Sequence, residues 1–324
     1  IEVNIGGIAQ GDVVALNNYM QQITVELIKL ASLIITLNKS MACAGRVSNV
    51  LAQPASMSYP AESVRPVADA QDAVCFDHVS FTYKNAGAPS LTDVSFRAKR
   101  GQTIGIIGGT GSGKSTLVSL IPRFYDPRQG TVTLDGEDAR KYTREALCEK
   151  VGVVQQRAVL FQGTIRDNLR WGSEHADDAA LWEALEAAQA KEVVEAKPGR
   201  LDFQLEQGGR NLSGGQKQRL SIARALVKKP EILILDDSSS ALDFATDAAL
   251  RRSIRNLGYG VTTFLVSQRI ACIRQADQIL VLDNGSLAGV GTHEQLLESC
   301  PLYQEIFDSQ FPGERKNAKE GNAQ

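Results

Sequence analysis

Apolar residues recur every three or four positions near the start of the chain, which predicts one stripe of a long helix from about residue 11 to about residue 52. The stripe consists of Val13, Leu16, Met20, Ile23, Leu27, Leu30, Ile34 and Leu37. The opposite side is polar and carries Asn18, Gln22, Glu26 and Lys29. From Gly11 to Leu37 the rise is about 40 Å at ~1.5 Å per residue, which is enough to cross a bilayer. However, the two charged residues would be costly against lipid, so this segment by itself favours an amphipathic helix of a soluble bundle or coiled coil.

The pattern changes after this helix. Residues 53–72 contain Pro54, Pro60 and Pro66 with small polar residues between them. Such a stretch is typical of an extended linker, so we expect a domain boundary here.

Short β-prone runs and helical stretches alternate beyond the linker. Residues 74–83 and 91–98 predict strands of a small antiparallel sheet. Three apolar runs predict buried strands at 103–107, 151–154 and 232–235. A helical stretch is expected between Thr164 and Lys197, with a core formed by Leu169, Trp171, Leu181, Trp182 and Leu185.

Composition narrows the function classes only slightly. The 324 residues are 43% hydrophobic and 22% charged, which is ordinary for a globular protein. A formal net charge of −2, without a long run of Lys and Arg, disfavours a nucleic-acid partner. The five cysteines show no C-x-x-C spacing, so neither a zinc site nor a disulfide framework is predicted. Because the sequence opens on Ile1 without a signal-peptide pattern, we expect it to begin partway through a longer protein.

The first buried strand leads into a glycine-rich turn that fits the phosphate-binding pattern G-x-x-x-x-G-K-S/T. The turn and the helix start comprise Gly108, Gly109, Thr110, Gly111, Ser112, Gly113, Lys114, Ser115 and Thr116. Glycines let backbone N–H groups point at a polyphosphate, and the helix N-terminus adds partial positive charge. Lys114 is expected to contact the β and γ phosphates, and the Ser115 hydroxyl to coordinate Mg²⁺.

Polar residues follow the other buried strands. Gln156 comes just after 151–154, where it can reach Mg²⁺ or an attacking water, although any exposed loop glutamine would look the same. Asp236 ends the strand at 232–235, which suits a carboxylate that holds Mg²⁺. Tyr83 lies at a strand end, where stacking on an adenine ring and packing in the core are equally compatible with its spacing.

A second glycine turn, Asn211-Leu212-Ser213-Gly214-Gly215-Gln216-Lys217-Gln218-Arg219, opens a helix at Gly214 and presents another anion-binding surface. The order of these motifs over residues 73–310 resembles the nucleotide-binding domain of ATP-binding cassette (ABC) transporters. This resemblance implies an α/β fold of the P-loop NTPase class, with a RecA-like core sheet, an antiparallel β subdomain and a helical signature subdomain.

Several residue roles are implied by the resemblance. Tyr83 would stack on adenine, Gln156 would be the Q-loop glutamine, and Asp236 would end the Walker B strand. The signature residues Ser213, Gly214, Gly215 and Gln216 would close over the ATP of a second cassette, because two cassettes pair head to tail in this family. The D-loop would be Ser240 to Asp243, with Asp243 near the nucleotide.

The segments 160–169 and 291–297 resemble the exporter branch, in which the cassette follows six membrane helices. Residues 1–52 would then be the end of an all-α membrane domain, 53–72 a linker, and 311–324 a disordered tail. The implied partners are a second half-transporter subunit, membrane lipid, and a transported small molecule, lipid or peptide. The parent protein would lie in the cell membrane with its cassette in the cytoplasm.

Two positions depart from the family pattern. Asp237 stands where a glutamate is usual as the general base, and Gln268 stands where a histidine usually contacts the γ-phosphate. Aspartate is one methylene shorter, and a misplacement of about 1 Å can cost on the order of 10²-fold in rate. Glutamine cannot carry a positive charge at neutral pH. Both changes weaken hydrolysis and leave ATP binding intact.

Both departures fall on the composite site built from this chain's own Walker motifs, whereas the signature matches the family. The sequence therefore favours one half of a heterodimeric exporter that holds a slow site and completes the active site of a different subunit. A catalytically active homodimeric exporter is the first alternative. The second is a non-transport ATPase of the same class or a nucleotide-gated clamp, although no coiled-coil insertion or zinc cysteines lie between Thr116 and Ile232.

Overall fold

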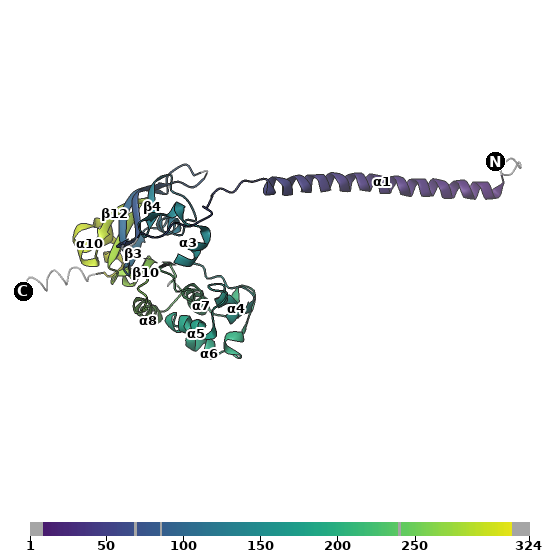
Figure 1. The fold of residues 1–324 in the computed structure, drawn as a ribbon. Coiled ribbons are helices and arrows are strands. Elements are labelled where there is room, and N and C mark those ends of the chain that lie inside the picture. Colours follow the sequence, from purple (N-terminus) through teal and green to yellow (C-terminus); the bar gives the residue numbers. More distant parts are fainter. Residues whose placement is uncertain (1–8, 68–69, 85, 239–240, 313–324) are drawn as a thin grey trace, which may run out of the picture. The chain divides into compact units, whose positions relative to one another are not determined.

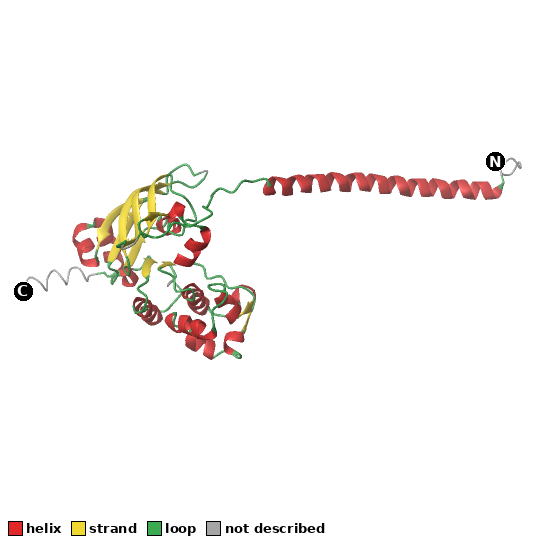
Figure 2. Cartoon of the chain, in the orientation of Figure 1, coloured by secondary structure: helices red, strands yellow, loops and turns green. Residues whose placement is uncertain are grey.

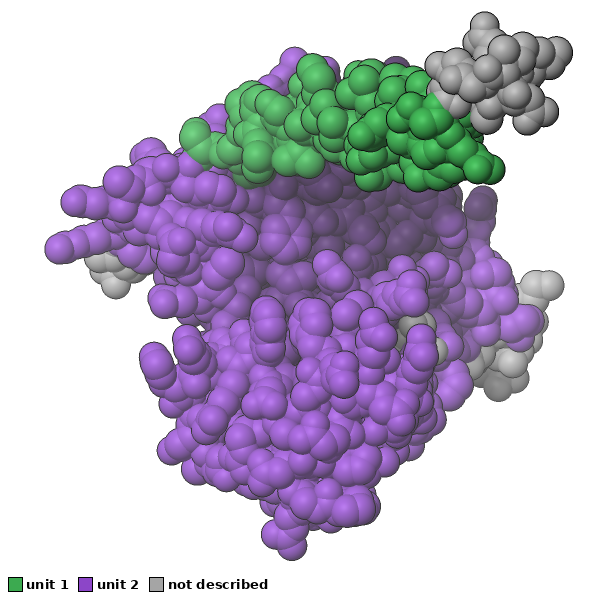
Figure 3. Space-filling view, turned by 90° about the vertical axis from the view of Figure 1, so that its right-hand side faces the viewer, with its two compact units in different colours: residues 1–58 green, residues 59–324 purple. Residues whose placement is uncertain are grey.

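The computed structural model describes residues 9–67, 70–84, 86–238 and 241–312. The chain divides into two units, residues 1–58 and residues 59–324, which are coloured green and purple in Figure 3.

The first unit is dominated by one helix, α1 (Gln10–Leu51), which confirms the predicted helix to within one residue at each end. By length and composition α1 could cross a membrane. Glu26 and Lys29, the two charged residues on its polar side, pair with each other at 2.7 Å. This pairing lowers the cost of placing either charge in an apolar environment.

The second unit is built on a six-stranded sheet. Its order is β12 (Ser286–Gly291), β11 (Gln278–Asp283), β3 (Thr103–Gly108), β10 (Thr262–Val266), β9 (Ile232–Asp236) and β6 (Val151–Val154). All neighbouring pairs are parallel except β11 with β12. The predicted buried strands at 103–107, 151–154 and 232–235 are β3, β6 and β9.

The second unit also contains a four-stranded antiparallel sheet, of which two strands precede β3 in the chain and two follow it. Its order is β2 (Leu91–Lys99), β1 (Asp72–Phe81), β4 (Gln129–Leu134) and β5 (Glu137–Asp138). The predicted antiparallel pair is confirmed, with Tyr83 two residues beyond the end of β1.

The helices form two sets. One set lies at the bottom of Figures 1 and 2 beside α8 (Phe244–Arg255), with the small sheet of β7 (Gly163–Thr164) and β8 (Gln204–Leu205) at its edge. It contains α4 (Ile165–Arg170), α5 (Asp178–Ala187), α6 (Lys191–Glu195) and α7 (Gly214–Leu226). The others are α2 (Lys114–Leu120), α3 (Arg144–Lys150), α8 (Phe244–Arg255), α9 (Ile270–Ile273), α10 (His293–Ser299) and α11 (Pro301–Gln310), with 3-10 turns at Ala139–Lys141, Arg200–Asp202 and Gln207–Gly209. The predicted α/β class, with an antiparallel β part and a helical part, is confirmed.

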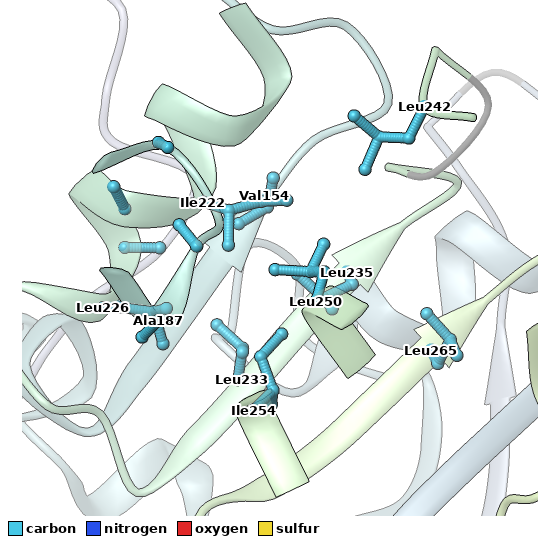
Figure 4. Close-up of a cluster of buried hydrophobic side chains, with 14 of the residues drawn as sticks. Val154, Ala187, Ile222, Leu226, Leu233, Leu235, Leu242, Leu250, Ile254 and Leu265 are labelled. Atoms are coloured by element: carbon cyan, nitrogen blue, oxygen red, sulfur yellow. The ribbon is translucent and has the colours of Figure 1, made fainter. Parts of the chain in front are cut away.

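The strands β6, β9 and β10 are buried on both faces of the central sheet, which explains why they are almost continuously apolar. Successive side chains of a strand point to opposite faces, so Leu233 and Leu235 join one core cluster while Ile232 and Ile234 join the other. Figure 4 shows the first cluster, in which side chains of β6, β9 and β10 pack against those of α5, α7 and α8.

The prediction that Trp171 belongs to the core is wrong. Trp171 is 70% exposed, and its ring stacks on that of Phe161 with the centroids 4.8 Å apart. The helical stretch is also broken between α4, α5 and α6. Trp171 keeps helical backbone angles at the end of α4, and two residues correspond to about 200° around a helix, so its side chain faces away from the buried Leu169. Leu169, Leu181 and Leu185 are buried as predicted, and Trp182 packs against the same core while partly exposed.

At the C-terminal end, Phe311 packs against the core cluster as a partly buried residue. The predicted disordered tail lies, from residue 313 onward, outside the described residues.

Candidate functional site

The carboxyl ends of four adjacent parallel strands meet at one edge of the central sheet. Val266 at the end of β10 pairs with Ile106 of β3 on one side and with Asp236 of β9 on the other. On the far side of β9, Val154 of β6 pairs with Leu235. The segments that follow these strands therefore emerge together, at the position where open α/β sheets bind ligands. They carry the phosphate loop, Gln268, Asp237 and Gln156.

A side chain at the glycine on either end of the phosphate loop would clash with the backbone. Gly113 is the residue before α2 and has φ 98°, and a Cβ there would lie 2.7 Å from the Ser90 carbonyl oxygen. At Gly108 a Cβ would lie 2.2 Å from the Leu282 carbonyl oxygen. Between them, Gly109, Thr110 and Gly111 are exposed, whereas Ser112 is buried. The loop is thus anchored at its ends and open at its middle, as a polyphosphate cradle must be.

Lys114 lies folded against this loop. Its Nζ donates to the carbonyl oxygens of Gly108 at 2.9 Å and of Gly109 at 2.6 Å. Burial lowers the pKa of Lys114, and the charges of Asp236 and Asp237 oppose that change. Within the described part of the chain Lys114 forms no ion pair. An ammonium group held by neutral carbonyls remains available to an incoming phosphate.

The three predicted magnesium ligands line one cleft of about 440 Å³ together with Tyr83. Ser115 Oγ donates to Asp236 Oδ1 at 3.1 Å. Burial raises the pKa of Asp236, with the Ser115 hydrogen bond acting against it. No group of three His, Cys, Asp or Glu residues suited to a metal occurs among the described residues. Hydroxyl, carboxylate and amide oxygens are the donors that Mg²⁺ prefers, so Ser115, Asp236 and Gln156 fit the ion when substrate phosphates supply further oxygens.

Asp237 lies just beyond β9 with φ 45°. Its backbone N–H donates to the Val266 carbonyl oxygen at 3.0 Å, and its Oδ2 accepts from Gln156 Nε2 at 3.1 Å. Burial raises the pKa of Asp237, while the Arg269 cation and the Gln156 hydrogen bond lower it. The two predicted catalytic residues Asp237 and Gln156 are therefore in contact, and the amide oxygen of Gln156 points away from this bond.

Gln268 is exposed and lies two residues beyond the end of β10. Its carbonyl oxygen accepts from Gln310 Nε2 at 2.7 Å. The guanidinium of the neighbouring Arg269 lies 5.3 Å from the ring centroid of Phe244. The sequence reasoning missed Arg269 and Gln310. The position of Arg269 beside Gln268 could have revealed the first, but no local pattern marks the second.

Tyr83 is partly buried beside the phosphate loop. Its hydroxyl lies 3.1 Å from Thr116 Oγ1, and its ring packs edge-on against Phe81 and Tyr125. Tyr83 therefore both packs against aromatic neighbours and lies beside the phosphate loop.

The signature turn belongs to a different group of elements. Ser213 and Gln216 form a reciprocal capping box at the start of α7, with Gln216 N to Ser213 Oγ at 3.3 Å and Ser213 N to Gln216 Oε1 at 3.1 Å. Ser213 and Gly214 are exposed. Residues 213–216 line neither the cleft described above nor a second one of about 490 Å³ beside Lys114.

Asp243 caps α8 by accepting from Thr246 N at 2.9 Å and from Thr246 Oγ1 at 2.8 Å. The start of the predicted D-loop at Ser240 lies outside the described residues. One chain thus brings together the phosphate loop, Gln156, Asp236, Asp237 and Gln268, and leaves the signature turn facing outward.

Comparison with known proteins identifies the family. Residues 91–240 match the ABC transporter family. An uncharacterized ABC transporter ATP-binding protein of Mycobacterium tuberculosis is 41% identical over 313 residues, which cover 96% of this chain and 53% of that protein. The probable multidrug resistance ABC transporter ATP-binding/permease protein YheI of Bacillus subtilis is 36% identical over 315 residues, covering 97% of this chain and 53% of that protein.

Among solved structures, a bacterial Atm1-family ABC exporter with ATP bound is similar with a TM-score of 0.79 and 32% identity. The match covers 95% of this chain and 54% of that chain. The chain therefore spans about half the length of the relatives that it matches.

Proposed function

Because the chain belongs to the ABC transporter family, we propose that it is the last membrane helix and the ATP-binding domain of an exporter subunit. The single observation that carries this proposal is the meeting of the phosphate loop, Gln156, Asp236, Asp237 and Gln268 at one sheet edge. In this proposal α1 and residues 1–52 end the membrane domain, and residues 73–310 form the cassette on its cytoplasmic side.

The cassette binds ATP with residues whose chemistry suits each part of the nucleotide. Tyr83 stacks on adenine, residues 108–116 hold the phosphates, and Lys114 neutralises phosphate charge. Ser115, Gln156 and Asp236 would hold Mg²⁺, which would shield the negative charge of the phosphates.

Hydrolysis at this site is slow because the two residues that act on water and the γ-phosphate are changed. Asp237 accepts the proton of the attacking water, but its carboxylate starts one methylene farther back than that of a glutamate. Gln268 donates a hydrogen bond to the γ-phosphate without adding positive charge. ATP therefore stays bound for longer at this site than at the partner's site.

The signature turn completes the active site of a different subunit. Its exposed position, with Ser213 and Gly214 facing outward at the start of α7, leaves it accessible to a nucleotide bound by another chain. Hydrolysis of that second ATP reopens the pair and resets the membrane helices.

One observation favours a catalytically active homodimer as a second candidate. Burial raises the pKa of the Asp237 carboxyl, and a raised pKa makes a carboxylate a better proton acceptor.

Mg-ATP hydrolysis by the intact parent subunit in lipid separates these candidates. It is measured for the subunit alone and co-expressed with the subunit encoded beside it. The heterodimer predicts near silence alone, turnover by the pair, and loss of turnover when the partner's base is removed but not when Asp237→Asn is made. Turnover by the subunit alone that Asp237→Asn abolishes establishes the homodimer instead. Recovery of the parent protein in the soluble fraction overturns the transport role altogether.

A further inference from the structure

The last residue of α11 holds the backbone on both sides of Arg269. Gln310 Nε2 donates to the Gln268 carbonyl oxygen at 2.7 Å, and Gln310 Oε1 accepts from the Ile270 N–H at 2.9 Å. The side-chain amide of Gln310 thus donates to one backbone carbonyl and accepts from a backbone N–H two residues further on. A neighbouring β-strand pairs with a backbone in the same way. The residues involved lie 40 and 42 positions apart in the sequence.

The Ile270 N–H needs such a partner. Ile270 is the first residue of α9, and the residue before it, Arg269, makes no side-chain capping bond. The first N–H groups of a helix have no partner within the helix. Gln310 supplies the missing acceptor from another element.

Both ends of this arrangement are anchored in the core. On α11, Tyr303 and Phe307 are buried, which fixes the helix that carries Gln310. On the other side, the buried Ser267 donates its backbone N–H to the Ile106 carbonyl oxygen at 3.1 Å. The segment 268–270 is therefore joined to the central sheet through Ser267 and held on both sides of Arg269 by Gln310.

We propose that Gln310 is a positioning residue that holds Gln268 against the γ-phosphate of bound ATP. This inference rests on the proposed function, which places Gln268 at the γ-phosphate. Gln310 itself does not touch the nucleotide. Its effect is transmitted through the Gln268 carbonyl, which shares a short and stiff backbone with the Gln268 side chain.

A residue that positions Gln268 at the γ-phosphate should affect the affinity for ATP but not that for ADP, because ADP lacks that phosphate. Gln310→Ala should weaken binding of Mg-ATP about 3- to 10-fold, the effect expected for one hydrogen bond, and leave Mg-ADP within about 2-fold. Gln310→Glu keeps the acceptor for Ile270 but loses the donor to Gln268, so it should resemble Gln310→Ala.

The matched control is Gln304→Ala on the same helix. Gln304 Nε2 also donates to backbone carbonyls, but to those of Leu297 and Glu298 at the end of α10. It should change the ratio of ATP to ADP affinity by less than about 2-fold. In a Gln268→Ala background, Gln310→Ala should produce no further change in this ratio.

Affinities are measured on the parent transporter in lipid by photolabelling with Mg-azido-ATP that carries a radiolabelled α-phosphate. Unlabelled ATP or ADP competes on ice, and the label is counted on this subunit alone after gel separation. A fall in ATP affinity only, absent in Gln304→Ala and in the Gln268→Ala background, supports the inference. Equal loss of ATP and ADP affinity, or equal effects of Gln304→Ala and Gln310→Ala, overturns it.

The Gln268→Ala variant tests the nucleotide role of Gln268 separately from the positioning role of Gln310. If it changes the affinity ratio and Gln310→Ala does not, the nucleotide role of Gln268 stands and the inference about Gln310 is wrong. If Gln268→Ala leaves the ratio unchanged, the assignment of Gln268 to the γ-phosphate is wrong, and the inference about Gln310 is refuted with it.

Discussion

Lengthening the side chain at position 237 should speed up hydrolysis at the site that we propose to be slow. In Asp237→Glu the carboxylate advances by about 1.5 Å, and misplacement of a reacting group by about 1 Å costs on the order of 10²-fold in rate. We therefore expect ATP turnover at this site to rise about 10- to 100-fold. Asp237 is partly exposed, and its partner Gln156 lines the cleft of about 440 Å³, so we expect the additional methylene to be accommodated.

The backbone tolerates this exchange at a modest cost. Asp237 has φ 45°, a conformation that aspartate adopts more readily than glutamate. Its N–H bond to the Val266 carbonyl oxygen does not involve the side chain and is retained. A loss of stability of about 1 kcal/mol or less is expected, which leaves the fold intact.

Phosphate release in lipid measures the change, with the general base of the partner subunit removed so that only this site can turn over. Asp237→Asn is the matched control, because it keeps the size of the side chain and removes the base. Adding Lys114→Ala to Asp237→Glu should abolish the gain. If Asp237→Glu leaves turnover unchanged, while the unmodified site already turns over at a rate that Asp237→Asn abolishes, then side-chain length does not limit this site.

Three further predictions concern other elements. Ser213→Ala removes the cap of α7 and should lower stability by about 1 kcal/mol. It should also reduce turnover at the partner's site. Unchanged turnover in the phosphate-release assay contradicts the proposed role of the signature turn at that site. Asp135→Leu should lower the free energy of unfolding by about 3 kcal/mol in urea titrations. It leaves the buried Lys150 without that carboxylate and removes the 2.6 Å ion pair between Asp135 and Arg100. A change below about 1 kcal/mol contradicts this prediction. Burial lowers the pKa of His293 in the folded protein, so the unfolded chain binds the proton more readily. The stability of the fold should therefore fall as pH drops below about 6.5. His293→Gln should flatten this dependence, measured as the melting temperature between roughly pH 7.5 and 5.5, the window of histidine titration.

The sequence was sufficient to locate the residues whose position follows from one strand end. Asp236 ends a buried apolar strand, Gln156 lies two residues beyond another, and Lys114 follows a third across the glycine loop. Parallel strands place their carboxyl ends at the same edge. Local glycine patterns also identified the helix starts at Lys114 and Gly214, because a tight turn before a helix has few alternatives in sequence.

Features that depend on distant contacts could not be predicted in this way. The stacking of Trp171 on Phe161 joins the end of α4 to the segment that precedes β7, and the helical period alone carries no information about that contact. Gln310 reaches the segment beside β10 only because α11 folds back onto the core. A glutamine at the end of an amphipathic helix looks like any other surface residue until that packing is known.

In the proposed function, the residues at the sheet edge divide into those that bind nucleotide and those that act on water. Lys114, Ser115 and Asp236 belong to the first set, and each has the residue type that its role requires. The departures, Asp237 and Gln268, belong to the second set. Gln310 still holds the segment that carries Gln268 in place, and an arrangement of this kind matters for γ-phosphate binding whether or not hydrolysis is fast. A site with these properties is suited to remain occupied by ATP while the signature turn of the same chain serves a faster site, which is the asymmetry that the proposed heterodimer requires.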